Sequence, residues 1–317
     1  MKKTVLAALA ALMLTLPAAA FELKTYPVNP GARPHDVAVG PDGIVWYTAQ
    51  GQGALGRLDP RNGAVRQIKL GERSAPHGVV IGPDGAPWVT DSGLNAIVRV
   101  DPRSELVKTF PLPKGSSYAN LNTLTFDKNG VVWFTGQSGI YGKADPKTGE
   151  VKIWDAPKGR GPYGIATTPS GEVWYSSLAG DHIAKINTAT GAVEVVDTPT
   201  KGAGARRVWS DSKNRLWVSL WNSGEVGLYD PQAKTWKKWK LPGNAPMAYS
   251  VYVDELDAVW LTDYGSNTIV RFDPKTEKFQ SFPGRNVRQM LGKPGEVWAP
   301  ESGDDRIIGV RYGPGTN

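Results

Sequence analysis

The sequence of 317 residues contains no cysteine and only three histidines. Without cysteine the chain forms no disulfide, and it offers no thiolate for zinc, an iron–sulfur cluster or nucleophilic catalysis. All histidine chemistry is restricted to His35, His77 and His182. A functional site in this chain must therefore combine one or more of these imidazoles with oxygen, amide or cationic side chains.

The sequence also lacks a long block of basic residues, although its formal net charge is +7. Lysines and arginines are interspersed with acids, which is weak evidence for a nucleic-acid partner, and we expect none. After the N-terminal segment, no apolar run approaches the roughly 20 residues that a membrane-spanning helix needs. We expect a monomer without a membrane span.

The N-terminal segment has the order of an export signal. Two lysines precede an apolar stretch from Val5 to Leu16, and small residues follow up to Ala20. This order is typical of a secretory signal peptide, and the stretch is too short for a membrane span. We predict a signal peptide over residues 1–20, cleavage near Ala20, and a single domain over residues 21–317. The mature protein is expected in the periplasm or outside the cell.

A repeated unit marked by tryptophan occupies the rest of the chain. A turn precedes each tryptophan, with glycine in five of the seven units, and an Asp-Pro turn such as Asp59-Pro60 follows many of them. The repeated residues are Trp46, Trp88, Trp133, Trp174, Trp217, Trp260 and Trp298. Each unit of about 42 residues holds four short strands and no helical period, which is typical of one propeller blade. The sequence predicts an all-β, seven-bladed β-propeller with four-stranded blades.

The two ends of the repeat predict how the ring closes. The last unit, residues 287–312, has room for only three strands, whereas residues 21–28 form an additional strand before the first unit. Pairing of this N-terminal strand with the last blade would close the ring and protect the edge of that blade. We therefore expect closure by the N-terminal strand.

One repeat position varies in a way that indicates function. Eleven residues before each tryptophan, just ahead of the innermost strand, the side chains are mostly polar, whereas a structural position would repeat one residue type. Two of the three histidines fall at this position in neighbouring units. We predict a ring of functional groups at the mouth of the central axis, formed by His35, His77, Asn122, Tyr163, Arg206, Tyr249 and, one residue out of register, Arg288.

Acidic and aromatic side chains are expected close to this ring. Asp91, Asp263 and Glu301 lie three residues after a repeated tryptophan, at the end of the second strand. Carboxylates beside histidines suit general acid–base catalysis, and they also suit a hard cation; we expect Asp91 and Glu301 as metal ligands. Such acids can instead accept hydrogen bonds from turn amides. Trp221 is predicted to stack on a ligand.

The repeats resemble those of a known family. Units of the form Gly-x-Val-Trp-Phe/Tyr-Thr, and openings such as Pro-His-Gly at 76–78 and Pro-Tyr-Gly-Ile at 162–165, resemble the virginiamycin B lyase family over residues 21–312. The resemblance implies a seven-bladed propeller and an enzyme that opens the ester linkage of a cyclic depsipeptide, such as a streptogramin B antibiotic, by elimination with Mg²⁺.

The resemblance also implies roles for individual residues. The family's active-site histidines lie in Arg-Pro-His and Glu-Pro-His openings, which residues 33–35 and 75–77 match, except that Ala75 replaces the metal-binding Glu. His77 would be the general base, and His35 would protonate or polarise the leaving group. Asp91 is the nearest match to a second acidic metal ligand.

Three functions stay open at the level of the sequence. The first is an exported lyase that opens a cyclic ester or depsipeptide. The second is a non-catalytic periplasmic propeller that binds a small molecule, a cyclic peptide or a protein at its mouth, and Ala75 favours this alternative. The third is a lactone hydrolase.

Overall fold

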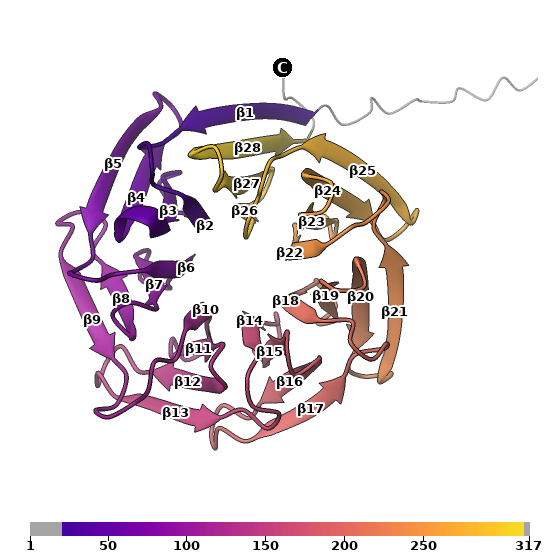
Figure 1. The fold of residues 1–317 in the computed structure, drawn as a ribbon, viewed down its shortest axis with the longest axis horizontal. Coiled ribbons are helices and arrows are strands. Elements are labelled where there is room, and N and C mark those ends of the chain that lie inside the picture. Colours follow the sequence, from indigo (N-terminus) through magenta and orange to yellow (C-terminus); the bar gives the residue numbers. More distant parts are fainter. Residues whose placement is uncertain (1–20, 314–317) are drawn as a thin grey trace, which may run out of the picture.

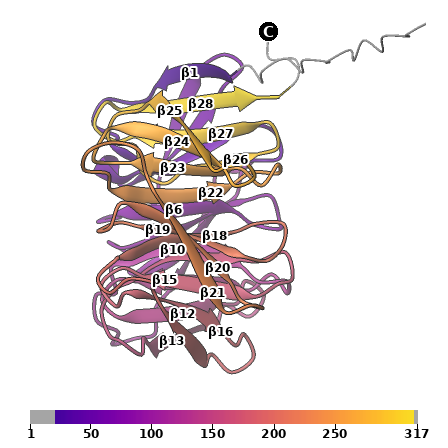
Figure 2. The same cartoon turned by 90° about the vertical axis from the view of Figure 1, so that its right-hand side faces the viewer.

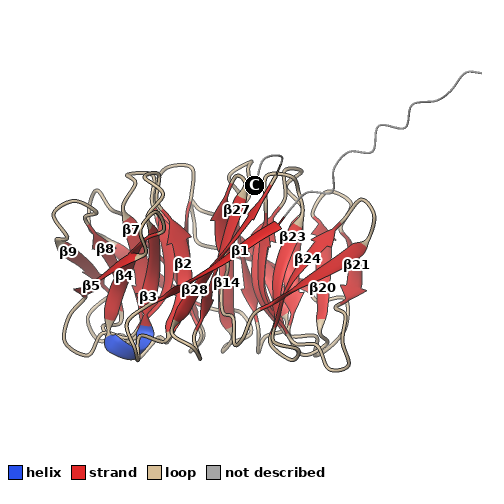
Figure 3. Ribbon diagram, turned by 90° about the horizontal axis from the view of Figure 1, so that it is seen from above, coloured by secondary structure: helices blue, strands red, loops and turns tan. Residues whose placement is uncertain are grey.

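The computed structural model describes residues 21–313, and the predicted signal peptide lies outside this range. The described chain forms seven four-stranded sheets arranged as blades around one axis (Figure 1). The predicted all-β, seven-bladed propeller is confirmed. Viewed across the axis, the strands run between two faces of a short cylinder, and loops cover both faces (Figure 3).

The blades follow one another in chain order, and the first strand of each blade is innermost. Blades 1 to 3 comprise β2 (Pro34–Val39), β3 (Val45–Ala49), β4 (Ala54–Asp59) and β5 (Ala64–Lys69); β6 (Pro76–Ile81), β7 (Pro87–Asp91), β8 (Ala96–Val100) and β9 (Val107–Pro111); and β10 (Leu121–Phe126), β11 (Val132–Gly136), β12 (Ile140–Ala144) and β13 (Val151–Asp155). Blades 4 to 6 comprise β14 (Pro162–Thr167), β15 (Val173–Ser177), β16 (His182–Ile186) and β17 (Val193–Asp197); β18 (Ala205–Ser210), β19 (Leu216–Leu220), β20 (Glu225–Asp230) and β21 (Thr235–Lys240); and β22 (Ala248–Val253), β23 (Val259–Asp263), β24 (Thr268–Asp273) and β25 (Lys278–Pro283).

Blade 7 is assembled from both ends of the described chain. It comprises β26 (Leu291–Lys293), β27 (Glu296–Glu301), β28 (Arg306–Tyr312) and β1 (Phe21–Pro27). A single 3-10 turn, η1 (Gln50–Gln52), follows β3 and is the one helical element within residues 21–313. Within that range, no helix has the length and apolar character needed to cross a membrane.

The repeated tryptophans form the packing between blades. All seven are buried, with at most 2% of their surface exposed. Trp298 of blade 7 packs in one cluster with Val37 of blade 1, and Trp88 of blade 2 packs with Leu124 of blade 3. Buried indole N–H groups need an acceptor. In six of the seven blades an acid shortly before the tryptophan supplies it, as where Trp133 Nε1 donates to Asp127 at 2.9 Å.

The N-terminal strand closes the ring as predicted. β1 pairs antiparallel with β28 from Phe21 opposite Tyr312 to Pro27 opposite Arg306, and the two strands lie side by side in Figures 1 and 2. Tyr26 of β1 is buried against Trp298, with 5.6 Å between ring centroids. The ring is thus held by a sheet and by aromatic packing rather than by a disulfide.

Candidate functional site

The side chains predicted to form a ring gather at one face of the propeller, here called the histidine face. Each is the second residue of an inner strand, so that all of them begin their strands at the same end of the axis. They are His35 in β2, His77 in β6, Asn122 in β10, Tyr163 in β14, Arg206 in β18 and Tyr249 in β22. In blade 7, Arg288 lies just before β26.

A register shift at the start of the inner strands shapes this face. The pairing of β2 with β3 shifts between Pro34 and Val37, and the inner strands of blades 2 to 6 shift at the equivalent place. Such irregularities re-aim side chains next to functional sites. Here the shift brings two consecutive side chains, such as His35 and Asp36, into one buried cluster.

A hydroxyl at each shift links one blade to the next. The Asp36 N–H donates to Thr48 Oγ1 at 3.0 Å, and the Thr48 hydroxyl donates to the carbonyl of His77 at 2.8 Å. The same pair of hydrogen bonds recurs through Thr90, Thr135, Ser176, Ser219 and Thr262. Each functional residue of blades 2 to 7 is therefore held by the preceding blade.

The two histidines of the ring are in direct contact. Their ring centroids are 4.0 Å apart, and each residue is no more than 7% exposed. His35 Nδ1 lies 2.7 Å from Asp36 Oδ1, and His77 Nδ1 lies 3.0 Å from the carbonyl oxygen of Asn122. Because both of these oxygens accept, each Nδ1 carries the proton and each Nε2 carries the lone pair.

The two Nε2 atoms face polar neighbours on the same ring. The Asn122 amide donates to His77 Nε2 at 3.2 Å, and the Tyr249 hydroxyl donates to His35 Nε2 at 3.3 Å. Burial lowers the pKa of His35 well below 6.5, and the charges of Arg207, Arg288 and Arg206 add to this effect. Burial, followed by the charge of His35, lowers the pKa of His77 in the same direction. Both imidazoles are therefore neutral at neutral pH.

Arginine and tyrosine side chains form the opposite side of the ring. The guanidinium carbon of Arg206 lies 3.9 Å from the ring centroid of Tyr249, 4.6 Å from that of Tyr163 and 4.3 Å from that of Trp221. Arg206 also donates to the Tyr163 hydroxyl at 2.7 Å, which in turn lies 3.3 Å from the Tyr249 hydroxyl. The aromatic rings thus hold the guanidinium through cation–π contacts.

The two tyrosines have different acidities. Burial raises the pKa of Tyr163, and the neighbouring Tyr249 raises it further. Burial also acts to raise the pKa of Tyr249, but the charges of Arg206, Arg207 and Arg288 outweigh it, so that this pKa lies below its ordinary value of 10.0. Tyr249 is therefore the more acidic hydroxyl of the pair.

A buried ion pair lies directly beneath the ring. Arg207 donates to Asp36 Oδ1 at 3.3 Å, and both side chains are at most 2% exposed. Arg207 also donates to the Thr123 hydroxyl. Burial raises the pKa of Asp36 despite the nearby guanidinium. Arg207 and Asp36 follow Arg206 and His35 by one residue, so the register shift brings them into the site.

The comparisons with known proteins identify the family. A model of the virginiamycin B lyase family matches residues 15–235 and 120–312.

The chain belongs to the virginiamycin B lyase family.

Solved structures of that family share the architecture. Virginiamycin B lyase from Staphylococcus aureus superimposes with a TM-score of 0.84 at 18% identity, covering 92% of this chain and 99% of that one. A streptogramin B lyase gives 0.83 at 21% identity, covering 92% and 98%. A catalytically inactive His-to-Ala variant of the Staphylococcus aureus enzyme, solved with quinupristin, gives 0.84 at 18%. At these identities the likeness establishes the fold alone. No protein of curated function matches the sequence.

Membership of the virginiamycin B lyase family implies Mg²⁺, but the clustered side chains do not fit this ion. Ligand atoms of His35, Asp36 and His77 lie within 4.8 Å of one another, the one such group within residues 21–313. Two imidazoles and one carboxylate suit transition metals better than Mg²⁺, which prefers an octahedron of oxygens. The carboxylate of Asp36 is already engaged by Arg207.

The acids predicted as metal ligands hold loops in this structure. Asp91 is fully buried and accepts hydrogen bonds from Ser74, at 2.5 Å, and from the amide of Ala75, at 2.9 Å. Glu301 accepts from the amide of Arg285 and the side chain of Arg306, at 2.7 and 2.9 Å. Neither belongs to the histidine cluster. The geometry thus favours their alternative role, as acceptors for loop amides.

The remaining predicted residues lie around Tyr249 and His77. Arg288 lies 5.5 Å from the ring centroid of Tyr249, and Trp221 packs edge-on against the same ring at 5.8 Å. A cavity of about 280 Å³ opens beside them, and Arg33, His35 and Arg288 line it together with uncharged side chains. Asn122, by contrast, is fully buried and acts on His77.

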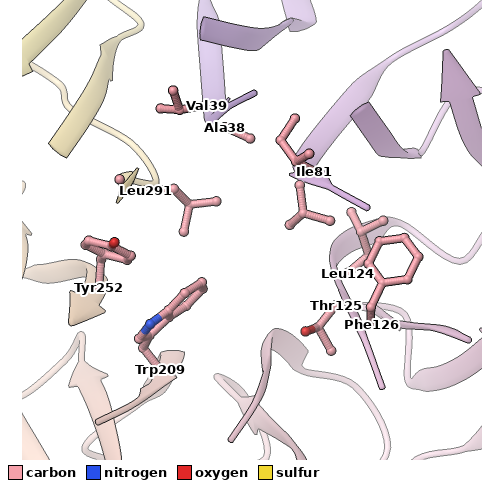
Figure 4. A pocket seen from close by; sticks show the side chains of 11 residues that line it. Ala38, Val39, Ile81, Leu124, Thr125, Phe126, Trp209, Tyr252 and Leu291 are labelled. Atoms are coloured by element: carbon pink, nitrogen blue, oxygen red, sulfur yellow. The ribbon is translucent and has the colours of Figure 1, made fainter. Parts of the chain in front are cut away.

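The opposite end of the axis has a different character. A cavity of about 350 Å³ lies where the inner strands end, and its wall includes Ile81, Leu124, Trp209, Tyr252 and Leu291 (Figure 4). No charged side chain or imidazole lines it. The polar chemistry of the axis is therefore concentrated at the histidine face.

Proposed function

We propose that this protein is an exported carbon–oxygen lyase that opens a cyclic ester or depsipeptide by elimination. The observation that carries the proposal is the contact between two neutral imidazoles, His35 and His77, with a lone pair on each Nε2. A neutral histidine whose other nitrogen is held by an acceptor is a suitable general base. Membership of the lyase family supports the same reaction class.

His77 is the proposed general base. The Asn122 carbonyl holds the proton on Nδ1, so that Nε2 takes the proton from the substrate carbon adjacent to the carbon that bears the ester oxygen. The electron pair of the broken C–H bond forms a carbon–carbon double bond, and the ester oxygen leaves as a carboxylate. The guanidinium groups of Arg206 and Arg288 stabilise the negative charge that develops. No step is routed through a metal ion.

His35 acts through Tyr249 in this mechanism. Because Nδ1 of His35 donates to Asp36, its Nε2 accepts the hydrogen bond of the Tyr249 hydroxyl. This contact positions an acidic hydroxyl between the imidazole and the guanidinium of Arg206. Tyr249 is the proposed donor that polarises the leaving oxygen once its one hydroxyl proton turns from His35 Nε2 to the substrate. Tyr163 and Trp221 hold the substrate.

Mass spectrometry after chromatography tests the proposal. The purified protein is incubated with quinupristin and with a set of other cyclic esters. Elimination gives a ring-opened product of unchanged mass that carries a double bond, whereas a lactone hydrolase adds the mass of one water. We expect the first product, and we expect it to be lost in His77→Ala and His35→Ala but not in Arg61→Gln, which alters an exposed arginine. Absence of any product from the unaltered protein, or equal product from His77→Ala, contradicts the proposal.

A binding propeller is the second candidate, and one observation favours it. Both Nε2 atoms are occupied by hydrogen bonds from Asn122 and Tyr249, and Ala75 offers no carboxylate to the site. Heat released on titration with quinupristin, without turnover, would favour this function.

Export is proposed from the N-terminal segment alone. The order of its lysines, apolar residues and alanines supports secretion. N-terminal sequencing of protein recovered from the periplasmic fraction should begin near Phe21, and a chain that retains its first residues there contradicts cleavage.

A further inference from the structure

The charges at the histidine face are not balanced. Arg206, Arg207 and Arg288 lie around Tyr249, whereas within residues 21–313 the one acid that pairs with any of these arginines is Asp36. Asp36 is already engaged by Arg207 and by His35, at 3.3 and 2.7 Å. Three guanidinium groups against one carboxylate leave two positive charges without a partner, and neutral histidines do not change this surplus.

The guanidinium groups also retain unused donors. Within residues 21–313, the buried Nε atoms of Arg206 and Arg207 have no hydrogen-bond partner. Arg206 and Arg288 form no ion pair in the same range; the contacts of Arg288 are aromatic rings and the Ser302 hydroxyl, at 3.3 Å. Charged groups that leave water are costly unless they are paired. A cluster built in this way is suited to a ligand that supplies the missing negative charge.

The adjoining cavity has the same sign of charge. Two arginines, Arg33 and Arg288, line it with His35, and no acidic side chain does. Its volume of about 280 Å³ is just below the roughly 300–1,000 Å³ of pockets for drug-sized ligands. The space suits a small ligand or one end of a larger one.

We infer that the histidine face binds a cyclic ester or depsipeptide that carries carboxylate groups, and that Arg206 and Arg288 hold these carboxylates. The planar guanidinium fork matches a carboxylate in two parallel hydrogen bonds. Two carboxylates would neutralise the two surplus charges. The inference deepens the proposed function by naming an anionic substrate class, and it rests on that function only for the location of the site.

Titration calorimetry at low ionic strength tests the inference with succinate as the probe. The matched control ligand is succinamide, which has the same carbon chain without charge. We expect succinate to bind and succinamide not to bind. Arg206→Gln and Arg288→Gln should each weaken succinate binding about tenfold or more, since a charge-assisted bidentate pair contributes that much. Arg61→Gln serves as the control variant, because that side chain is 72% exposed and pairs with Asp59.

Each outcome separates the inference from the proposed function. Equal binding of succinamide, unchanged binding in both arginine variants, or no binding of succinate overturns the anion site, whereas lyase activity on a cyclic ester is measured independently. Binding of inorganic phosphate in preference to succinate would overturn the carboxylate assignment. His77→Asn should keep succinate binding while it loses lyase activity, and loss of binding in this variant contradicts a site built on the arginines.

Discussion

The surplus of positive charge predicts that the two members of the buried ion pair are not equally important for stability. Asp36→Asn removes the one negative charge and leaves Arg207 buried beside Arg206 and Arg288 without a counter-charge. Arg207→Met removes one of three cations instead. The remaining Asp36 can then take up a proton, because burial already raises its pKa, and the neutral acid can still accept the hydrogen bond from His35.

The magnitudes follow from the cost of an unpaired buried charge. Breaking a buried pair on the side that leaves an ion uncompensated costs about 3–5 kcal/mol, and we assign this range to Asp36→Asn. For Arg207→Met we expect about 1–2 kcal/mol, because protonation relieves the remaining charge. With an unfolding entropy of about 2.1 cal/mol/K per residue, a ring of roughly 300 residues loses about 1.6 °C in Tm per kcal/mol. The expected shifts are about 5–8 °C for Asp36→Asn and about 2–3 °C for Arg207→Met.

Thermal unfolding followed by circular dichroism measures both shifts. Arg61→Met is the control, since its exposed pair with Asp59 should contribute at most about 1 kcal/mol. The double variant Asp36→Asn/Arg207→Met should be more stable than Asp36→Asn alone, because the second change removes the orphaned cation. The reasoning fails if Arg207→Met is as destabilising as Asp36→Asn, or if the second change does not rescue the first.

Two further predictions concern the ring and its acid sensitivity. Tyr26→Ala should lower the free energy of unfolding by about 3 kcal/mol, because it removes a buried aromatic ring from the closing strand. The exposed Thr25→Ala is the control and should change this free energy little. Deletion of residues 21–28 should lower Tm further, and an unchanged Tm would refute closure by this strand. Because the folded-state pKa values of His35 and His77 lie below 6.5, the unfolded chain binds protons first as the pH falls. The free energy of unfolding, measured in urea, should therefore decrease as the pH falls below about 6.5. The decrease should be less steep in His77→Asn, and an equal pH dependence of the two proteins would contradict a lowered pKa for His77.

Much of the fold could be predicted from the sequence because its repeat carries the packing. The spacing of Trp46 and its equivalents places one large side chain in each blade, and each of them is buried. A short last unit and a strand-like start at residues 21–28 predicted closure, which β1 and β28 confirm. The same register placed His35 and His77 in neighbouring blades, where the structure brings their rings into contact.

The lower layer of the site could not be predicted in the same way. Asp36 and Arg207 follow the predicted ring by one residue, and an ideal strand would direct alternate side chains to opposite faces. The register shift at the start of the inner strands overrides this alternation. A signal was present in the sequence: Thr48 and Ser219 stand two residues after a repeated tryptophan, where a hydroxyl receives the shifted amide.

The position of the acids is a second case in which spacing alone left two answers. Asp91 and Glu301 lie at the end of the ring that carries the histidines, as their repeat position predicted. Their oxygens are nevertheless engaged by loop amides and by Arg306, which no sequence pattern distinguishes from an acid that faces a ligand. Only the hydrogen-bond partners separate the two roles.

The absence of a carboxylate at position 75 and the presence of three arginines both make the electrostatic potential at the histidine face more positive. A divalent cation at the histidines would stand close to Arg206, Arg207 and Arg288, and each unit positive charge at short range in a buried site opposes it by several kcal/mol. A glutamate at position 75 would offset only one of those charges. The same field favours an enolate or a departing carboxylate, so that the arginines can supply the stabilisation that Mg²⁺ would otherwise provide. For the proposed elimination, guanidinium groups would therefore serve this site better than a metal ion.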